Sequence, residues 1–208
     1  KFWAKFFKSL NQTRRIIKDF RPDAAVGTGG YISFPLIFTA HFMGVKTAVH
    51  DSNARLGLAN RVCGKFADLF MLGLPVDKKI RNSVLTSTPI RSEFADAADR
   101  TAVLEGLGLD PAKRTALIFG GSQGAKGLNA ASAQAVKELA KTARGWQFIH
   151  ITGERWFGVI REEYAGLGNI AVLPYSHEIY ALMRTADLAV CRSGASTLAE
   201  LIYCRLPA

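Results

Sequence analysis

Short apolar segments alternate with amphipathic segments along the whole chain. The apolar segments predict strands at Asp23–Gly27, Lys46–His50, Ala67–Leu72, Thr115–Gly120, Gln147–Ile151, Ile170–Leu173 and Leu188–Cys191. The segments between them have a helical period and predict helices at Ser33–Met43, Leu56–Phe66, Ala125–Ala143, Arg155–Ala165, Glu178–Thr185 and Ser196–Cys204. Strands and helices that alternate over short connections form parallel sheets covered by helices on both faces. We therefore predict an α/β protein.

The alternation is interrupted between Leu74 and Asp110, a stretch that contains Pro75 and Pro89 and is followed by Pro111. Within it, Arg81–Thr88 has no recognisable helical period. Proline-rich breaks of this kind are typical of connections between domains. We therefore predict a hinge between two Rossmann-like domains, residues 1–90 and residues 91–208.

Composition and charge narrow the class of protein. The 208 residues are 49% hydrophobic and 21% charged, as in an ordinary globular protein. The formal net charge of +10 favours an anionic partner, which is a nucleic acid, a membrane surface or a phosphorylated substrate. No recognised nucleic-acid motif is present, so the first of these is the weakest.

Three further features of the sequence concern its cellular setting. The three cysteines are not in metal-ligand or disulfide-framework spacing, which fits a reducing cytosol. The longest apolar run, Tyr31–Val45, is interrupted by Pro35 and His41 and is too short to span a bilayer. The chain begins without Met inside a helical pattern, so we expect an internal fragment of a longer protein.

The first helical segment concentrates the positive charge. Residues 1–21 contain seven Lys and Arg against the single acid Asp19. Aromatic and basic side chains interleave at its start, at Trp3, Lys5, Phe6, Phe7 and Lys8. This pattern fits an interfacial helix on an anionic membrane, and it fits equally a core-facing helix with a solvated basic side. A second apolar stripe, Ile16, Ile17 and Phe20, is expected to pack against the core.

Two glycine-rich loops each follow a predicted strand and open a helix, at Val26–Tyr31 and at Phe119–Ala125. Glycine lets the backbone approach a ligand, and the helix N-terminus behind it favours phosphate. For either loop alone, a tight turn without a ligand is equally compatible with the sequence. Neither loop fits the dinucleotide or the Walker pattern.

Two polar clusters also follow strands, where parallel sheets bind ligands. In Cys191–Glu200, Ser196 or Thr197 is expected to cap the next helix. Glu200 is either a carboxylate near the helix start or an acceptor for two ribose hydroxyls. In the other cluster, His50-Asp51-Ser52-Asn53, the histidine is a weak candidate for a catalytic base, because a lone histidine beside a strand is more often a hydrogen-bonded structural residue.

In their order along the chain, these segments resemble the MurG family of glycosyltransferases, which add N-acetylglucosamine (GlcNAc) to lipid I in peptidoglycan synthesis. The resemblance extends over essentially all 208 residues. The segments that carry it are Gly27–Ser33, His50–Asn53, Gly57–Arg61, Pro89–Arg91, Gly120–Ala125, Pro174-Tyr175 and Arg192–Glu200. It implies the GT-B fold, in which two Rossmann-like domains face a cleft.

The resemblance also implies the binding residues. In the C-terminal domain, Ser122 would hold the diphosphate of UDP-GlcNAc with Arg91 nearby, Ser176 would lie at the uracil, and Glu200 would bind the ribose. Asn53 of the other domain would reach the donor as well. Further donor contacts would come from Ala195, Ser196 and Thr197, and acceptor contacts from Gly27, Thr28, Gly29, Gly30 and Tyr31.

An inverting transfer from UDP-GlcNAc to the C4 hydroxyl of MurNAc in lipid I, giving lipid II, is the activity that the resemblance implies. We expect no cofactor and no metal, since no Asp-x-Asp motif occurs. The implied location is the cytoplasmic face of the bacterial cell membrane, with other cell-wall enzymes as possible partners. Alternatives are a GT-B glycolipid synthase or a UDP-GlcNAc epimerase.

The sequence departs from the family pattern at three points. Asp51 and Ser52 stand where the family has Glu and Gln, Phe34 stands where a glycine is usual, and Ser87-Thr88 replaces Gly-Asn. The first two departures concern the predicted acceptor side more than the donor side.

Overall fold

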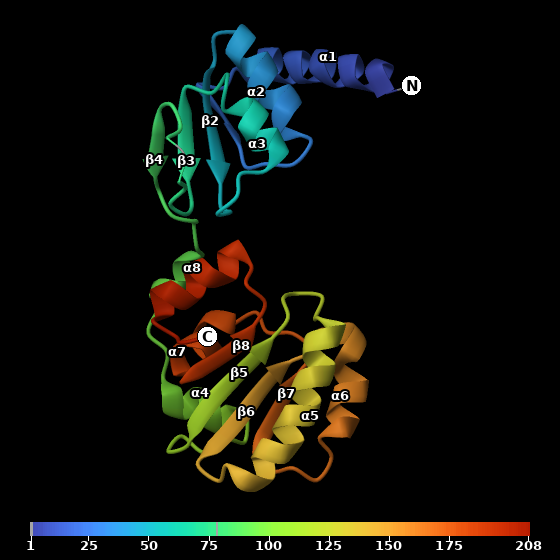
Figure 1. Cartoon of the computed structure of the whole chain (residues 1–208), viewed down its shortest axis with the longest axis vertical. Coiled ribbons are helices and arrows are strands. Elements are labelled where there is room, and N and C mark those ends of the chain that lie inside the picture. The colour runs from blue at the N-terminus through green and yellow to red at the C-terminus, as the bar shows by residue number, and fades with distance from the viewer. Residues whose placement is uncertain (1, 78) are drawn as a thin grey trace. The chain divides into compact units, whose positions relative to one another are not determined.

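The computed structural model describes residues 2–77 and 79–208, which form two compact units (Figure 1). Unit 1 is Lys1–Pro89 and unit 2 is Ile90–Ala208. The boundary between the two units falls within the stretch between Leu74 and Asp110, where the sequence predicts a hinge. The first part of this stretch belongs to unit 1, and its second part is packed into unit 2, where Phe94 and Leu104 are fully buried.

Unit 1 contains a four-stranded parallel sheet in the order β1-β2-β3-β4. Its elements are α1 (Phe2–Phe20), β1 (Ala24–Gly27), α2 (Ser33–Phe42), β2 (Lys46–Asp51), α3 (Leu58–Cys63), β3 (Leu69–Leu72) and β4 (Ser83–Leu85). The core between α2, α3 and the sheet is formed by Ile37, Val49, Cys63, Phe70 and Leu72. All three strands expected here are present, to within two residues of the predicted bounds.

Two expectations for unit 1 are corrected. Strand β4 was not predicted, because all three of its residues are exposed and have no apolar alternation. Only its pairing with β3 makes it a strand. The second stripe of α1 does not pack as a whole, since Ile17 is buried whereas Ile16 and Phe20 are 58% and 78% exposed.

Unit 2 contains a second parallel sheet, in the order β7-β6-β5-β8. Its strands are β5 (Arg114–Phe119), β6 (Trp146–Ile151), β7 (Ile170–Leu173) and β8 (Leu188–Cys191). Its helices are η1 (Ser92–Ala95), α4 (Arg100–Gly106), α5 (Lys126–Thr142), η2 (Glu154–Trp156), α6 (Phe157–Glu163), α7 (Ile179–Thr185) and α8 (Ala195–Cys204). The predicted α/β class and parallel sheets are confirmed.

Helices cover both faces of the sheet in unit 2, because the strand residues alternate between two cores. Leu117, Phe119, Ile149 and Ile151 pack with residues of α4, α7 and α8. Ala116, Ile118 and Phe148 pack with residues of α5 and α6 on the opposite face (Figure 1). The alternation of side chains along a strand produces this two-sided packing.

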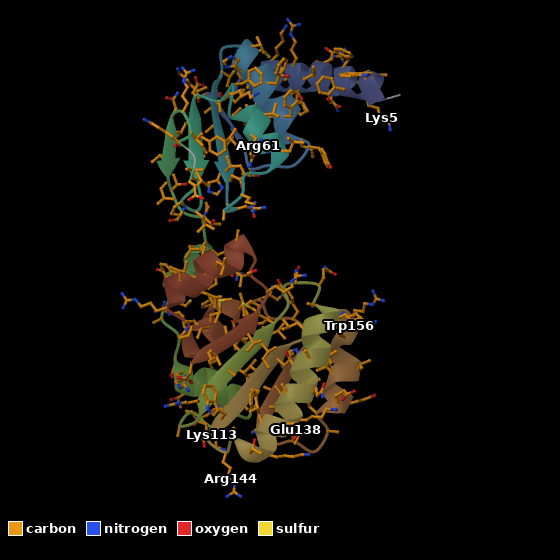
Figure 2. All side chains as sticks on the ribbon, viewed as in Figure 1. Lys5, Arg61, Lys113, Glu138, Arg144 and Trp156 are labelled. Atoms are coloured by element: carbon orange, nitrogen blue, oxygen red, sulfur yellow. The ribbon has the colours of Figure 1, made fainter. Side chains whose placement is uncertain are left out.

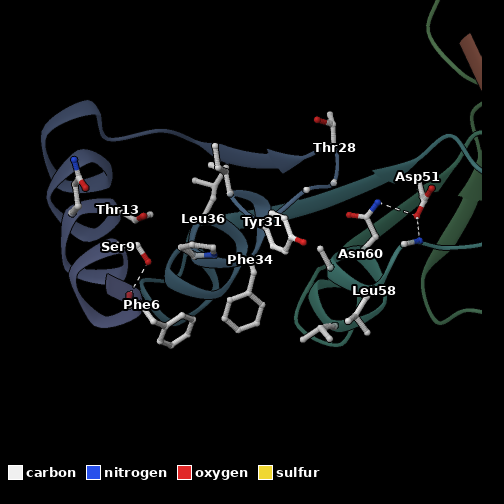
Figure 3. Close-up of a pocket in the computed structure, with 18 of the residues that line it drawn as sticks. Phe6, Ser9, Thr13, Thr28, Tyr31, Phe34, Leu36, Asp51, Leu58 and Asn60 are labelled. Carbon is white, nitrogen blue, oxygen red and sulfur yellow. Dashed lines mark hydrogen bonds between the residues drawn. The ribbon is translucent and has the colours of Figure 1, made fainter. Parts of the chain in front are cut away.

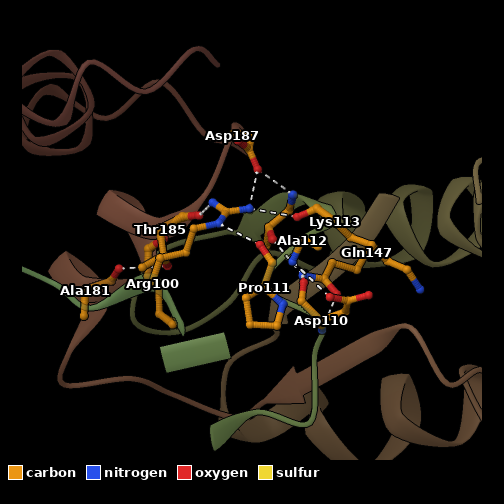
Figure 4. Close-up of polar contacts among 11 residues, drawn as sticks. Arg100, Asp110, Pro111, Ala112, Lys113, Gln147, Ala181, Thr185 and Asp187 are labelled. Carbon is orange, nitrogen blue, oxygen red and sulfur yellow. Dashed lines mark hydrogen bonds and ion pairs between the residues drawn. The ribbon is translucent and has the colours of Figure 1, made fainter. Parts of the chain in front are cut away.

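At the amino-terminal end of this sheet, polar contacts join segments that are distant in sequence (Figure 4). Arg100 donates to the carbonyl oxygens of Thr185 and Lys113 and forms an ion pair with Asp187, at 3.0 Å. Asp187 also accepts from the Thr115 amide at 2.7 Å. Gln147 bonds both backbone groups of Asp110. These contacts fix the start of the strands, opposite to the end where ligands bind in parallel sheets.

A buried histidine supports the other end of the same sheet. His150 is fully buried, and its burial lowers its pKa from 6.5 to about 4, so the ring is neutral near pH 7. Its Nε2 lies 3.2 Å from Asn129 Oδ1, and its Nδ1 lies 2.9 Å from the Tyr164 hydroxyl. The Asn129 amide donates to the Thr152 carbonyl at 2.8 Å. The network therefore links α5 and α6 to the end of β6.

We expect the stability of unit 2 to fall as the pH is lowered from about 6.5 to about 4. Over this range the unfolded chain binds a proton at His150, whereas the folded chain resists it, so the free energy of unfolding decreases by up to about 3 kcal/mol. Urea denaturation at several pH values measures the slope. His150→Gln should flatten it, and His177→Gln, at an exposed histidine of the same unit, should not. An equal slope in wild type and His150→Gln would contradict the assignment.

Candidate functional site

A small cavity in unit 2 lies at the carboxyl ends of β5, β6 and β7. It has a volume of about 150 Å³ and is lined by Phe119, Gly121, Ser122, Ile151, Tyr175, Ser176, Ile179, Thr197 and Glu200. Typical small-molecule sites measure roughly 300–1,000 Å³, so this cavity accommodates one portion of a larger ligand. Four of the predicted donor residues, Ser122, Ser176, Thr197 and Glu200, come together in it from separate segments.

The glycine loop of this site is held by close backbone contact. Gly124 and Gly153 both have positive φ angles, of 71° and 83°. A Cβ on Gly153 would lie 2.6 Å from the Gly124 nitrogen, and a Cβ on Gly124 would overlap the Thr152 carbonyl. Only glycine fits at both positions. The loop between β5 and α5 is therefore fixed against the loop that follows β6. The hydrogen bonds from His150 through Asn129 end at the Thr152 carbonyl, which lies in this contact.

Burial and a nearby cation act on Glu200 in opposite directions. Partial burial raises the pKa of its carboxyl, and the positive charge of Arg91 opposes this shift. Arg91 itself makes a long hydrogen bond of 3.5 Å to the His177 carbonyl, and its guanidinium carbon lies 5.5 Å from the Phe94 ring centroid. The structure thus places the charge of Arg91 near Glu200. That Arg91 also lies beside the diphosphate stays a prediction.

The start of α8 differs from the expectation. The helix begins at Ala195 with Gly194 as its N-cap, and no side chain caps it. Ser196 and Thr197 therefore lie inside the first turn, and neither is the capping residue. Glu200 lies beyond that turn, too far along the helix for a capping box. This removes the main structural explanation for a half-buried carboxylate at this position.

Not every predicted donor residue reaches the cavity in unit 2. Ala195 and Ser196 lie at the start of α8 but outside the lining. Asn53 belongs to unit 1. Arg192 lies beside the glycine loop, with its Nη2 3.5 Å from the position that a Cβ on Gly121 would take. No role for Arg192 was predicted from the sequence. The strand order β5-β8, which was not predictable from the sequence, is what brings it there.

Unit 1 has a larger cavity, of about 1100 Å³ (Figure 3). Four predicted acceptor residues, Thr28, Gly29, Gly30 and Tyr31, line it, whereas Gly27 is buried beneath the loop. Most of the remaining surface is apolar or polar without charge, and the lining includes Phe6, Ser9, Thr13, Ile16, Phe34, Leu36, Asn53, Leu58 and Val62. Such a cavity can hold a ligand that combines a polar group with an apolar chain.

The turn after β2 is organised by one carboxylate, Asp51, which is 2% exposed. Its Oδ1 accepts from the amide and the side chain of Asn53, and its Oδ2 accepts from the Gly57 amide and Asn60 Nδ2, all at 2.9–3.1 Å. Burial disfavours the ionised form, but the hydrogen bonds outweigh it and the pKa of Asp51 is lowered. Asp51 therefore serves to hold Asn53 and α3.

Asn60 connects this turn to the glycine loop of unit 1. Its amide nitrogen donates to the His50 carbonyl as well as to Asp51. Its Oδ1 is buried and has no hydrogen-bond partner among the described residues. The side chain lies against Gly29, at 3.3 Å from the position of a Cβ there (Figure 3). The oxygen is thus available to a hydroxyl or an N–H of a bound molecule.

His50 has a structural role in this geometry. It is buried, it does not line the cavity of unit 1, and its Nε2 lies 3.0 Å from the Ser87 carbonyl. A carbonyl only accepts, so Nε2 carries the proton, and the unprotonated Nδ1 lies 3.5 Å from the Ser52 hydroxyl. The role of His50 as a catalytic base stays a prediction. Ser87 has a φ of 60°, which explains why glycine is usual at this position.

An aromatic surface extends from α1 across α2 to the end of α3. Phe34, at the second departure from the family pattern, stacks on Phe6 at 5.8 Å and on Phe38 at 5.4 Å. We call this surface the aromatic face; it consists of Trp3, Phe6, Phe7, Phe34, Phe38, Phe42 and Phe66. Trp3, Phe7 and Phe42 are 64–67% exposed. The sequence analysis missed the α2 members, although Phe34, Phe38 and Phe42 have helical spacing.

Basic side chains accompany the aromatic face. Lys5 and Lys8 are exposed on α1, and Figure 2 shows Lys5 extending from the amino-terminal part of this helix. Unit 1 carries fourteen of the 27 Lys and Arg but only five of the 17 Asp and Glu. The net charge of the chain therefore resides almost entirely in unit 1.

The described residues contain neither a group of metal-ligating side chains nor a membrane-spanning helix. In residues 2–77 and 79–208, no three His, Cys, Asp or Glu side chains are grouped as they would be around a metal ion. Over the same residues, no helix combines the length and the apolar character needed to cross a bilayer. The three cysteines are free thiols.

Two Rossmann-like units, each with a glycine loop at the carboxyl end of a parallel sheet, define the GT-B class of proteins. Sequence models of the glycosyltransferase family 28 N-terminal domain and C-terminal domain match residues 1–71 and 115–208. The chain belongs to glycosyltransferase family 28.

Similar proteins in other organisms carry one and the same name, UDP-N-acetylglucosamine–N-acetylmuramyl-(pentapeptide) pyrophosphoryl-undecaprenol N-acetylglucosamine transferase. The one from Elusimicrobium minutum is 51% identical over all of this chain, and the one from Acetivibrio thermocellus is 36% identical over 98% of it. The chain spans 57% and 56% of their respective lengths.

Solved structures agree with the fold. MurG of Acinetobacter baumannii matches 95% of this chain and 55% of its own with a TM-score of 0.74 at 27% identity. A putative UDP-N-acetylglucosamine 2-epimerase of Listeria monocytogenes matches 96% of this chain and 60% of its own, with a TM-score of 0.68 at 14% identity. The second likeness concerns the fold alone.

Asp51→Asn should destabilise unit 1 by about 2 kcal/mol at pH 7, because an amide nitrogen would face backbone and side-chain donors that now bond a carboxylate. The lowered pKa means that Asp51 contributes stability above the unfolded pKa near 3.8 and that this contribution is lost as the pH falls through the folded pKa. Urea denaturation at pH 7 and in acid, followed by circular dichroism, measures both effects. Asp19→Asn, which removes an exposed charge from α1, is the matched control. Equal stability of the two variants would refute the role of Asp51.

Proposed function

We propose that this protein transfers GlcNAc from UDP-GlcNAc to the C4 hydroxyl of MurNAc in lipid I, with inversion at the sugar C1. In this proposal unit 2 binds the nucleotide sugar and unit 1 binds the lipid-linked acceptor. The relatives are named for this reaction, which supports the proposal. Because the chain spans only 57% and 56% of their lengths, the proposal concerns the whole protein.

One observation carries the donor assignment. A hydroxyl at a glycine loop, Ser122, and a half-buried carboxylate, Glu200, line the same cavity at the carboxyl edge of the sheet in unit 2. Amides and a hydroxyl at a helix N-terminus suit a diphosphate, and a carboxylate suits the two hydroxyls of a ribose. A ligand with both groups in sequence is a nucleoside diphosphate.

The transfer itself requires stabilisation of the leaving group. The acceptor hydroxyl oxygen forms a bond to C1 and gives up its proton to a base, the bond from C1 to the phosphate oxygen breaks, and its electron pair remains on UDP. The N-terminus of α5, a helix of 17 residues, carries partial positive charge at the loop that would hold this diphosphate. This stabilisation is electrostatic and is supplied by groups already fixed in position.

The cavity of unit 1 supports binding of the acceptor. Its glycine loop, Thr28–Gly30, offers backbone groups to a pyrophosphate, and its apolar lining suits a polyprenyl chain. Asn60 Oδ1 adds an acceptor for a sugar hydroxyl or an acetamido N–H.

The aromatic face supports attachment to an anionic membrane from the cytoplasmic side. Exposed Trp and Phe side chains insert at the level of lipid headgroups, and adjacent lysines attract anionic lipids. A protein that acts on a lipid-linked substrate needs such a surface near its acceptor site. Phe6 belongs both to the aromatic face and to the lining of the cavity in unit 1.

A transfer assay on the intact protein with radiolabelled UDP-GlcNAc and lipid I tests the reaction. Labelled lipid II is the expected product. Transfer to a different lipid, without transfer to lipid I, would contradict lipid I as the acceptor. Formation of UDP-N-acetylmannosamine would favour an epimerase, the second class to which the fold is similar.

Glu200→Gln should weaken UDP-GlcNAc binding by about 10- to 100-fold, because hydrogen bonds to a charged group contribute about 1.5–3 kcal/mol and each 1.4 kcal/mol corresponds to tenfold. Isothermal titration calorimetry measures the affinity. The loss should be smaller for 2′-deoxy-UDP, which lacks one of the two hydroxyls. Glu178→Gln, at an exposed residue before α7, is the control variant.

The pH dependence provides a further check on Glu200. Because burial raises the pKa of its carboxyl, wild-type affinity should decrease in mild acid as the carboxylate becomes protonated. Glu200→Gln should not show this decrease. Unchanged affinity of Glu200→Gln at neutral pH would exclude the residue from the site.

Replacing Trp3 and Phe7 together by Ser should weaken binding to vesicles that contain anionic phospholipid by at least tenfold, because each exposed aromatic contributes apolar area. Vesicle co-sedimentation measures the binding. Phe20→Ser removes an aromatic that is 78% exposed on the same helix but outside the aromatic face, and should change little. Equal binding by the double variant and wild type would contradict membrane attachment through α1 and would show that it is a solvated surface helix.

A further inference from the structure

The carboxyl edge of the sheet in unit 2 brings Arg192 next to the glycine loop. Strands β5 and β8 are neighbours, and their register pairs Phe119 with Cys191. The residues that follow the two strands, Gly120-Gly121 and Arg192, therefore leave the sheet side by side. The Nη2 of Arg192 lies 3.5 Å from the position that a Cβ on Gly121 would take.

Arg192 is not engaged elsewhere in the described part of the chain. Its side chain is exposed, and no hydrogen bond or ion pair joins its guanidinium to any residue that the structure describes. Arg100, by contrast, is occupied by Asp187 and backbone carbonyls, and Arg184 donates to the Phe94 carbonyl. An unpaired guanidinium beside Gly121 and Ser122 is thus available to an anion from solution.

Unit 2 has little net charge with which to attract a diphosphate, since its thirteen Lys and Arg face twelve Asp and Glu. Attraction of a diphosphate to unit 2 therefore depends on individual cations near the cavity. Arg91 acts on Glu200, at the part of the site suited to a ribose. Arg192 is a cation next to the glycine loop, at the part suited to phosphates, and Lys126 follows the loop as the first residue of α5.

We propose that Arg192 is a phosphate-binding residue, which contacts the diphosphate of the nucleotide sugar from the β8 side of the glycine loop. The planar guanidinium offers paired N–H donors that match phosphate oxygens, and its charge adds to that of the α5 N-terminus. The absence of a side chain on Gly121, whose φ is 91°, leaves the space through which the two groups approach. This inference rests on the proposed binding of a nucleoside diphosphate in unit 2.

The test compares UDP, UMP and uridine binding by calorimetry in wild type, Arg192→Gln and Arg192→Lys. Arg192→Gln should weaken UDP binding by 10- to 100-fold and leave uridine binding within twofold. UMP should lose less than UDP. Arg192→Lys keeps the charge but lacks the paired N–H donors of a guanidinium. Its UDP affinity should therefore lie between those of wild type and Arg192→Gln. Raising the salt concentration should weaken UDP binding to wild type more than to Arg192→Gln.

Arg144→Gln is the matched control, because it removes the same charge from unit 2 at the amino-terminal end of the sheet (Figure 2). Its UDP affinity should stay within twofold of wild type. An equal loss of uridine and UDP binding in Arg192→Gln, or no loss of either, would overturn the proposal for Arg192 and leave the donor site standing. If wild type binds neither UDP nor uridine, the proposed function fails and the inference with it.

Discussion

Backbone contact without intervening side chains is the constraint on which the site in unit 2 depends. Gly124 and Gly153 bring the loops after β5 and β6 together at distances that any Cβ would prevent. This contact allows α5 to begin directly behind β5, with its N-terminus at the cavity. The neutral, fully buried His150 bonds Asn129, which in turn bonds the Thr152 carbonyl in the same loop. The geometry of the proposed diphosphate site is therefore set by packing beneath it.

Unit 1 stabilises the corresponding edge of its sheet by a different means. There an ionised carboxylate, Asp51, gathers four donors and holds both Asn53 and Asn60. Both carboxylate oxygens of Asp51 accept hydrogen bonds, whereas Asn60 Oδ1, beside the glycine loop, has no partner among the described residues. The carboxylate is thus a structural component at the edge of the cavity in unit 1.

The distribution of charge separates the proposed tasks of the two units. Unit 1 combines most of the positive charge with an exposed aromatic face, which suits a surface that meets anionic lipid. Unit 2 is nearly neutral, so it cannot rely on a general field to bind a diphosphate. In the proposed site, binding depends on the α5 N-terminus and on single arginines, of which Arg192 is placed by the strand order.

The sequence by itself determined the α/β class, seven of the eight strands and the two glycine loops, because these features depend on local periodicity and on backbone freedom. Strand β4 escaped it, since its three exposed residues become a strand only by pairing with β3. The capping expectation for Ser196 and Thr197 failed because Gly194 is the N-cap of the helix, so that both residues lie inside its first turn. Only the tertiary structure decided that Ser122, Ser176, Thr197 and Glu200 share a cavity and that Arg192 stands beside Gly121. The physical reason is that strand order and register join residues far apart in sequence, and no local pattern encodes either.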